Sequence, residues 1–150
     1  MDMDLIRHND TNGDGMMKAL SLPADVYTNP VSFIRTVRKG LPGLVIKQAI
    51  QELSADRDVF ARLLKTDSGN LHRFYKRKAL SRVQSEEVLD TVKVYVEAGT
   101  VFGGREGSHE WLHTVILALF GSHPVDLLDT FVGRELVRQV LRKISYGEFS

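Results

Sequence analysis

One short segment of the chain has residue types and a spacing that are typical of a metal enzyme. Residues 108–114 read Ser-His-Glu-Trp-Leu-His-Thr, so that His109, Glu110 and His113 form the pattern H-E-x-x-H. Side chains four residues apart lie on one face of a helix, where two imidazoles can bind a single zinc ion. The adjacent glutamate can then activate a zinc-bound water for peptide hydrolysis. The segment therefore raises the hypothesis of a zinc metallopeptidase.

The rest of the sequence does not complete such an enzyme. One class of these peptidases needs a third ligand at position 119, which is Leu here, and another needs a downstream glutamate, for which only Glu135 has a suitable spacing. Both classes also use a β-strand to align the substrate, and no segment has the pattern of a strand. We therefore predict no catalytic residue, no metal site and no cofactor. A metallopeptidase, or adventitious zinc binding by His109 and His113 without catalysis, stays open as an alternative.

A second metal-binding pattern, near the start of the chain, is incomplete. Residues 10–15 read D-T-N-G-D-G and begin like the loop of a calcium-binding EF-hand, with Asp10, Asn12 and Asp14 as ligands. The twelfth position of that loop requires a bidentate glutamate and is Ser21. We interpret the stretch as a solvated turn in a flexible N-terminal segment, residues 1–30.

The composition limits the class of protein. A chain of 150 residues suits one domain or two very small ones, and 43% hydrophobic with 26% charged residues indicates a soluble globular protein. No apolar run is as long as a membrane span requires, and no signal peptide is evident. The absence of cysteine excludes disulfides and thiolate chemistry and favours a cytoplasmic location. The net charge of +1 indicates no overall attraction to nucleic acid, so the distribution of charge carries more information than its sum.

Apolar residues recur at helical spacing after residue 30, and no segment alternates with the period of a strand. Gly40 is placed to end the first helix, and Ser81 with Gln84 forms a capping box for the longest one. The sequence therefore predicts an all-α fold. The expected helices cover residues 31–39, 41–53, 56–65, 68–78, 82–98, 110–119, 125–129 and 133–144.

The expected helices 56–65 and 68–78, joined by a tight turn, are compatible with a helix-turn-helix reader of DNA. Ala61 is the small residue needed where the second helix crosses the first, and Leu71 is placed to pack into the core. Asp67 is placed to cap the second helix, while Lys65 occupies a position at which such turns often carry glycine.

The charge of the second expected helix supports that interpretation. From Arg62 to Arg82 there are seven lysines and arginines and a single acidic residue, Asp67. Basic side chains gain free energy by releasing counterions from phosphates, and Arg or Asn can also read base edges in the major groove. The residues predicted to contact DNA are Ser68, Asn70, His72, Arg73, Lys76, Arg77 and Lys78.

The end of the chain is unusually apolar. Tyr146 and Phe149 lie within five residues of the last position, where most chains are polar. Arg138, Arg142 and Lys143 lie on the preceding helix. Two aromatic rings near a free end must pack on the body of the protein or dock into a partner. A cationic, aromatic tip suits a cleft that normally accepts an anionic ligand.

The same segment carries a resemblance to a known family. The pattern P-x-x-L-L-D-T, a Gly three residues after the Thr, and a final L-x-x-I-x-Y-G-x-F-S resemble the toxin-binding domain of Xre/ParS/MbcA-type antitoxins. Upstream, F-A-R-L-L at 60–64, V-F-G at 101–103 and W-L at 111–112 resemble other parts of the family, so the similarity covers roughly residues 40–150. The sequence departs from the family at Val115-Ile116, Phe120 and Ser122. The residues of the terminal pattern are Pro124, Leu127, Leu128, Asp129, Thr130, Gly133, Leu141, Ile144, Tyr146, Gly147, Phe149 and Ser150.

The resemblance implies an antitoxin of a type II toxin–antitoxin system. Such a protein would have an Xre-like helix-turn-helix bundle at residues 31–98 that binds operator DNA, expected as a homodimer because DNA half-sites are symmetric. Residues 99–150 would form a small helical domain that covers the active site of a RES-domain toxin, an NAD-degrading enzyme. A helix-turn-helix regulator without a toxin stays open as an alternative. The residues expected to contact the toxin are Asp129, Arg138, Arg142, Lys143, Tyr146, Gly147, Phe149 and Ser150.

Overall fold

The architecture is taken from a computed structural model, which describes residues 15–147. Within these residues the only β-type pairing is an isolated antiparallel bridge between Ile116 and Ser122, so the predicted all-α fold is confirmed. No helix in the described part of the chain is long and apolar enough to cross a membrane. The helices, with η for 3₁₀-helices, are α2 (Pro30–Lys39), α3 (Leu44–Leu53), α4 (Arg57–Leu63), η1 (Leu71–Phe74), α5 (Arg82–Phe102), α6 (Arg105–Leu112), η2 (Leu117–Leu119), η3 (Pro124–Leu127) and α7 (Phe131–Ser145).

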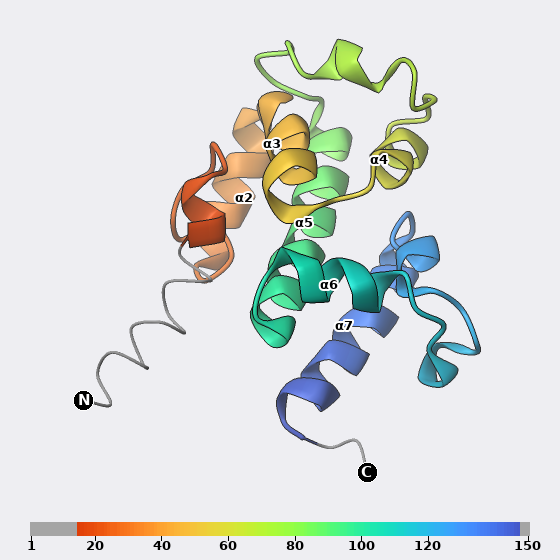
Figure 1. The fold of residues 1–150 in the computed structure, drawn as a ribbon. Coiled ribbons are helices and arrows are strands. Elements are labelled where there is room, and N and C mark those ends of the chain that lie inside the picture. The colour runs from red at the N-terminus through yellow and green to blue at the C-terminus, as the bar shows by residue number, and fades with distance from the viewer. Residues whose placement is uncertain (1–14, 148–150) are drawn as a thin grey trace.

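The longest helix, α5, lies at the centre of the molecule. Its start has the predicted capping box, in which the Ser81 hydroxyl accepts from the Gln84 amide and the Gln84 side chain accepts from the Ser81 amide. Buried residues lie on more than one side of α5, because α2, α3, α4, α6 and α7 all pack against it (Figure 1). A helix that is apolar on several sides is stable only inside a core.

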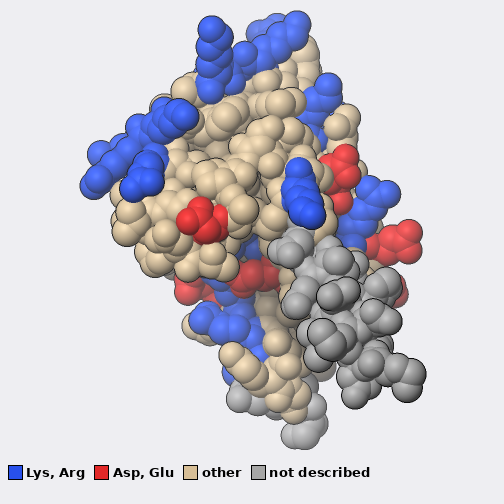
Figure 2. Space-filling view, turned by 90° about the vertical axis from the view of Figure 1, so that its left-hand side faces the viewer, with Lys and Arg blue, Asp and Glu red and all other residues tan. Residues whose placement is uncertain are grey.

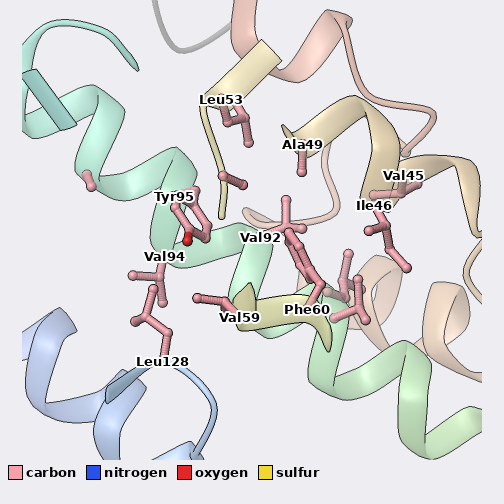
Figure 3. Packing of buried hydrophobic residues seen from close by; sticks show 14 of the residues in the cluster. Val45, Ile46, Ala49, Leu53, Val59, Phe60, Val92, Val94, Tyr95 and Leu128 are labelled. Atoms are coloured by element: carbon pink, nitrogen blue, oxygen red, sulfur yellow. The ribbon is translucent and has the colours of Figure 1, made fainter. Parts of the chain in front are cut away.

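A single hydrophobic core therefore connects the two halves of the chain. Phe60, Val92, Val94 and Leu128 belong to the same buried cluster as the α3 residues, and Figure 3 shows Phe60 and Val92 on the side of α3 and Val94 facing Leu128. The predicted boundary between residues 98 and 99 falls inside α5, which runs unbroken to Phe102. The division into two domains stays a prediction. In this fold both parts share one helix and one core.

The predicted helix over 68–78 is wrong, since the structure has only the four-residue η1 there. Lys65 adopts a left-handed backbone, with a φ angle of 55°, and the Asp67 carboxylate accepts hydrogen bonds from the backbone and side-chain amides of Asn70. The contact of Asp67 with the Asn70 amide is the one expected of a helix cap, but only a single 3₁₀ turn follows it. The chain is then held against the turn before α3, where the amide of Gly43 donates to the carbonyl of Arg77 at 2.9 Å.

Glycine is required at that contact. A Cβ atom on residue 43 would lie 1.7 Å from the carbonyl oxygen of Phe74, so the backbone of η1 packs directly on Gly43. Leu80 likewise donates its amide to the carbonyl of Leu41 at 2.8 Å. The segment is thus attached to the rest of the bundle through the Arg77 carbonyl, the Leu80 amide and the close packing of Phe74 on Gly43. These contacts are remote in sequence, and they accompany a 3₁₀ turn in place of the predicted α-helix.

Two further helices are shorter than predicted. The helix expected over 110–119 ends at Leu112, and the one expected over 125–129 is the 3₁₀-helix η3. The other predicted helices agree with the structure to within a few residues at their ends. The EF-hand-like residues Asp10, Asn12 and Asp14 lie outside the described residues.

Candidate functional site

Helix α7, which carries three of the eight residues predicted to contact a toxin, is attached to α5 by buried arginines. The side chain of Arg134 is only 1% exposed. Its nitrogens bind the carboxylates of Asp90 at 2.7 Å and Glu87 at 2.9 Å, and the carbonyl of Leu128 at 3.0 Å. A buried charge is tolerated only when it is paired in this way. We call Glu87, Asp90, Arg134 and Arg138 the arginine network.

Arg138 also belongs to this network rather than to the surface. It is 6% exposed, and its guanidinium binds Asp90 at 3.0 Å and Glu135 at 2.8 Å. Burial lowers the pKa of Arg138, but its hydrogen bonds and the charges of Asp90 and Glu135 outweigh this, so that the pKa is raised overall. A side chain held in this way is not available for direct contact with a partner. Arg138, predicted as a contact residue, therefore holds α7 against α5 instead of facing a partner.

Sequence reasoning missed Arg134, although the sequence contains a signal for it. Arg134, Val137, Arg138 and Leu141 are spaced as one helical face, and that face is buried. Two arginines among the apolar residues of a buried face require carboxylates on the facing helix, and α5 provides Glu87 and Asp90.

The C-terminal end of α7 is exposed. Arg142 and Lys143 are exposed on its last turn, and Tyr146 is 76% exposed. Gly147 follows in a left-handed conformation, with a φ angle of 67°. The predicted residues Phe149 and Ser150 lie outside the described residues. Arg142, Lys143 and Tyr146 therefore form an accessible end of the helix, which we call the α7 tip.

Asp129 lies elsewhere, just before the other end of α7. Its carboxylate is 3.6 Å from the guanidinium of Arg62 on α4, and its side chain is 32% exposed. The structure thus does not bring Asp129 together with the α7 tip. A surface ion pair of this kind contributes little to stability, and Asp129 stays accessible at the rim of the C-terminal part.

The loop between α6 and η3 presents apolar side chains that the sequence analysis did not identify as a site. Leu117 and Phe120 are each 89% exposed, whereas Leu119 between them is 1% exposed. The Ile116 amide donates to the Ser122 carbonyl at 3.0 Å, and the Gly121 amide donates to the Ile116 carbonyl at 3.1 Å. These bonds close a tight loop, which we call the apolar loop (residues 115–122). Its signal in the sequence is the run Leu-Ala-Leu-Phe where a helix was expected.

The backbone of the apolar loop is held in an uncommon conformation. Phe120 has a φ angle of 60°, in the left-handed region that residues other than glycine rarely adopt. Such backbone strain persists only where neighbouring structure enforces it, and it is concentrated at functional sites. Val115 in the same loop, and Phe131 and Val132 in the first turn of α7, are also exposed. Large apolar side chains with this degree of exposure are often found on surfaces that bind another protein.

A different surface lies at the other end of the molecule, over η1. On the face shown in Figure 2, Lys and Arg side chains stand out from the end where residues 65–80 lie in Figure 1, and Asp67 is the one exposed acidic residue of that segment. We call this surface the basic cap. Arg77 lies over the ring of Phe74, 4.3 Å from its centre. The exposed members of the cap are His72, Arg73, Lys76, Arg77 and Lys78.

The other two residues predicted to contact DNA, Ser68 and Asn70, make hydrogen bonds to carboxylates of the protein itself. The hydroxyl of Ser68 donates to the carboxylate of Asp58, and the amide of Asn70 donates to Asp67. Both side chains are partly buried. The structure therefore brings five of the seven predicted residues together on one exposed surface and gives Ser68 and Asn70 a role in shaping the turn beneath it.

The residues of the H-E-x-x-H pattern lie on and just after α6. His109 and His113 face each other, with ring centres 4.3 Å apart, although α6 ends at Leu112 and His113 caps it. Glu135, the downstream residue considered as a third ligand, instead binds Arg138. Glu135 therefore does not act as the third zinc ligand that a peptidase of this kind would need.

Comparisons with known proteins show which family this chain resembles. The model of a family described as "Antitoxin Xre/MbcA/ParS C-terminal toxin-binding domain" matches residues 97–147. That range contains α6, the apolar loop, α7 and the α7 tip. The chain is also 32% identical, over 133 residues, to a protein of Sphingobium sp. (strain YBL2) named "Prs ADP-ribosylating antitoxin". The similarity covers 81% of this chain and 83% of that relative.

Proposed function

The chain belongs to the family of Xre/MbcA/ParS-type antitoxins, and we propose that it neutralises a RES-domain toxin that consumes NAD. Neutralisation occurs by docking of the apolar loop and the α7 tip over the active-site cleft of the toxin. The observation that carries the proposal is that the matched toxin-binding range contains the two most exposed large apolar side chains, Leu117 and Phe120, on a constrained backbone.

The two parts of this surface have different tasks in the proposal. The apolar loop supplies buried area, since Leu117 and Phe120 are almost fully exposed in the free protein. Burying a large apolar side chain contributes about 1.5–3 kcal/mol. The α7 tip supplies an aromatic ring, Tyr146, suited to a cleft that accepts a nucleotide, and the charges of Arg142 and Lys143 for groups at its rim.

The decisive experiment removes the tip. Cells expressing the toxin together with the full chain should grow and keep their NAD, whereas a chain lacking residues 142–150 should fail to protect them. Tyr146→Ala tests the same surface without removing half-buried Ile144. Circular dichroism should show an unchanged helix content for Tyr146→Ala and the loss of only the last turn of α7 for the shortened chain. Full protection by both the shortened and the substituted chain would overturn the role of the tip.

The name of the Sphingobium relative refers to ADP-ribosylation of Prs. Transfer of ADP-ribose to a protein uses NAD as the donor, and so does plain NAD hydrolysis, but only transfer leaves a modified protein. The cognate toxin of this chain can therefore be classified by measuring NAD and protein-bound ADP-ribose together. Addition of the antitoxin should suppress whichever product is formed, because it covers the site at which NAD binds.

We further propose that the basic cap binds operator DNA and that the protein, as a homodimer, represses its own operon. The supporting observation is the cluster of five exposed basic or imidazole side chains over η1. Since η1 is a single 3₁₀ turn, contacts with phosphates are expected to contribute more than readout of bases by an inserted helix. A gel-shift titration with the upstream DNA of the operon tests this. Binding of DNA without any effect on a neighbouring toxin would favour the stand-alone regulator.

A further inference from the structure

The two histidines of α6 have a third partner that is remote in the sequence. Asp56 lies in the segment between α3 and α4, and its Oδ1 is 2.7 Å from Nε2 of His113. One ligand atom from each of Asp56, His109 and His113 can be chosen so that all three lie within 4.8 Å of one another. We propose that these three side chains form a binding site for a divalent transition-metal ion of the zinc class, which connects α6 to the α3–α4 segment.

The three ligand atoms, all within 4.8 Å of one another, are near enough to converge on one ion after side-chain movement. Zinc bonds to histidine nitrogen and carboxylate oxygen are about 2.0–2.2 Å long, so two ligands of a tetrahedral ion are roughly 3.3 Å apart. Opening the contact between His113 and Asp56 from 2.7 Å to that value requires a movement below about 1 Å. His109 and His113 are exposed and Asp56 is partly buried, so the exposed rings can make this adjustment.

The carboxylate of Asp56 is oriented by a buried group. The hydroxyl of Tyr95 on α5 donates to Oδ2 of Asp56 at 2.6 Å and accepts from the Asp56 amide at 3.2 Å. This leaves Oδ1 directed towards the histidines. Hydrogen bonds to the ligands, from groups that do not touch the ion, are a regular feature of metal sites. A pair of exposed histidines alone would lack such support.

The fourth position of the ion would face solvent. Asp56 and His113 line a hollow of about 330 Å³, whose other side contains His123 and Asp126. His123 is paired with Asp126 at 3.3 Å and is not part of the three-residue cluster. Water can therefore complete the coordination. Because Glu110 is not part of the cluster either, the inference concerns a structural ion and not peptide hydrolysis.

The choice of ion follows from the ligands. Two imidazoles and one carboxylate suit zinc and its neighbours in the first transition row, whereas magnesium and calcium prefer sites made entirely of oxygen. A bound ion would join residues 56 and 109, which are far apart in sequence, and would stabilise the folded state in proportion to its affinity. It would hold α6, which lies in the toxin-binding range, against the N-terminal half.

The test uses the full-length chain without an affinity tag. Titration with zinc against a chromophoric chelator should show one ion per chain and a rise in melting temperature, with no rise for magnesium. Cobalt should give the visible spectrum of a four-coordinate site. His109→Ala should abolish one-to-one binding, and Asp56→Asn, which preserves the size and hydrogen-bonding capacity of the side chain, should weaken it strongly. Tyr95→Phe should lower the affinity about 10–100-fold.

Matched controls separate this site from non-specific binding. His123→Ala removes an imidazole from the same hollow, and His8→Ala removes one from outside the described residues. Both should bind zinc as the unaltered chain does. Unchanged affinity in His109→Ala or in Asp56→Asn would overturn the proposal, as would failure of the unaltered chain to bind zinc at all. Melting curves without metal verify that every variant is folded.

Discussion

The basic cap and the apolar loop differ in both chemistry and backbone. The cap consists of long basic and imidazole side chains on the 3₁₀ turn η1 and the residues that follow it, and its polar neighbours Ser68 and Asn70 stabilise the turn that precedes it. The apolar loop consists of Leu117 and Phe120, exposed on a backbone held by the Ile116–Ser122 bridge. Flexible charged side chains can bind a polyanion with regularly spaced charges, because such binding does not require one fixed arrangement of the side chains. Stiffly held apolar groups suit a partner with one complementary shape.

The two surfaces also depend differently on the core. The segment that carries the cap is attached through backbone hydrogen bonds to residues 41 and 43. The C-terminal part is attached to α5 through the arginine network as well as through apolar packing. Breaking one attachment should therefore affect one surface more than the other. The following predictions test that difference.

The largest effect is expected from Asp90→Ala. It removes the carboxylate shared by Arg134 and Arg138 and leaves two buried guanidinium groups short of a partner. The free energy of unfolding should fall by about 3–5 kcal/mol, as measured by urea denaturation. Hydrogen exchange should show α7 opening first, and toxin neutralisation should be lost before DNA binding. Equal loss of protection in α7 and in residues 41–80 would show that the two regions unfold as one unit.

A smaller effect on binding is expected from Leu117→Ser combined with Phe120→Ser. Both side chains are 89% exposed, so the stability should change little. If they are central contacts, each should contribute about 2 kcal/mol or more to the affinity for the toxin, measured by calorimetry with the purified toxin. Val83→Ser is the control, because Val83 is 72% exposed on α5 outside the matched range. Similar toxin affinity in all three proteins would remove the apolar loop from the interface.

The combination Arg73→Ala and Lys76→Ala should weaken operator binding while toxin neutralisation persists. Each specific contact contributes roughly 1–3 kcal/mol to the binding free energy. Each lost phosphate contact should reduce the slope of log affinity against log salt concentration by about one. Arg142→Ala with Lys143→Ala removes the same charge from the α7 tip and serves as the reciprocal control. It should reduce neutralisation and spare DNA binding in the gel shift. If both double variants bind DNA equally well, the cap is not the DNA surface.

The smallest effect is expected at Glu97, on the helix that both surfaces share. Burial raises the pKa of this carboxyl group, against the opposing charges of Lys93, Arg138 and Arg142. Since the folded chain binds this proton more tightly than the unfolded chain, the resulting stability is present at low pH and is lost as the pH rises through the folded pKa. Glu97→Gln should therefore raise stability slightly at neutral pH, by less than about 0.5 kcal/mol, and flatten its dependence on pH. A clear loss of stability would contradict this sign.

Much of the fold was determined by local sequence alone. Helices α2, α3, α5 and α7 were predicted because their apolar residues repeat at helical spacing and their ends carry strong signals, such as the capping box at Ser81 and Gly40 after α2. These signals act between residues a few positions apart, so they can be recognised without knowing the tertiary structure. The basic character of residues 62–82 and the aromatic, cationic end of α7 were evident for the same reason.

Tertiary contacts decided the rest. In place of the helix predicted over 68–78, the chain forms a 3₁₀ turn and is then hydrogen-bonded to residues 41 and 43. The loop after α6 is closed by the pairing of Ile116 with Ser122. Arg138 has a charged side chain of the kind usually found at the surface, but it is buried because Asp90, 48 positions earlier, lies opposite it and pairs with it. Asp56 meets His113 across 57 positions. Spacing along the chain indicates which side chains share a helical face, but only the packing of the helices determines what that face meets.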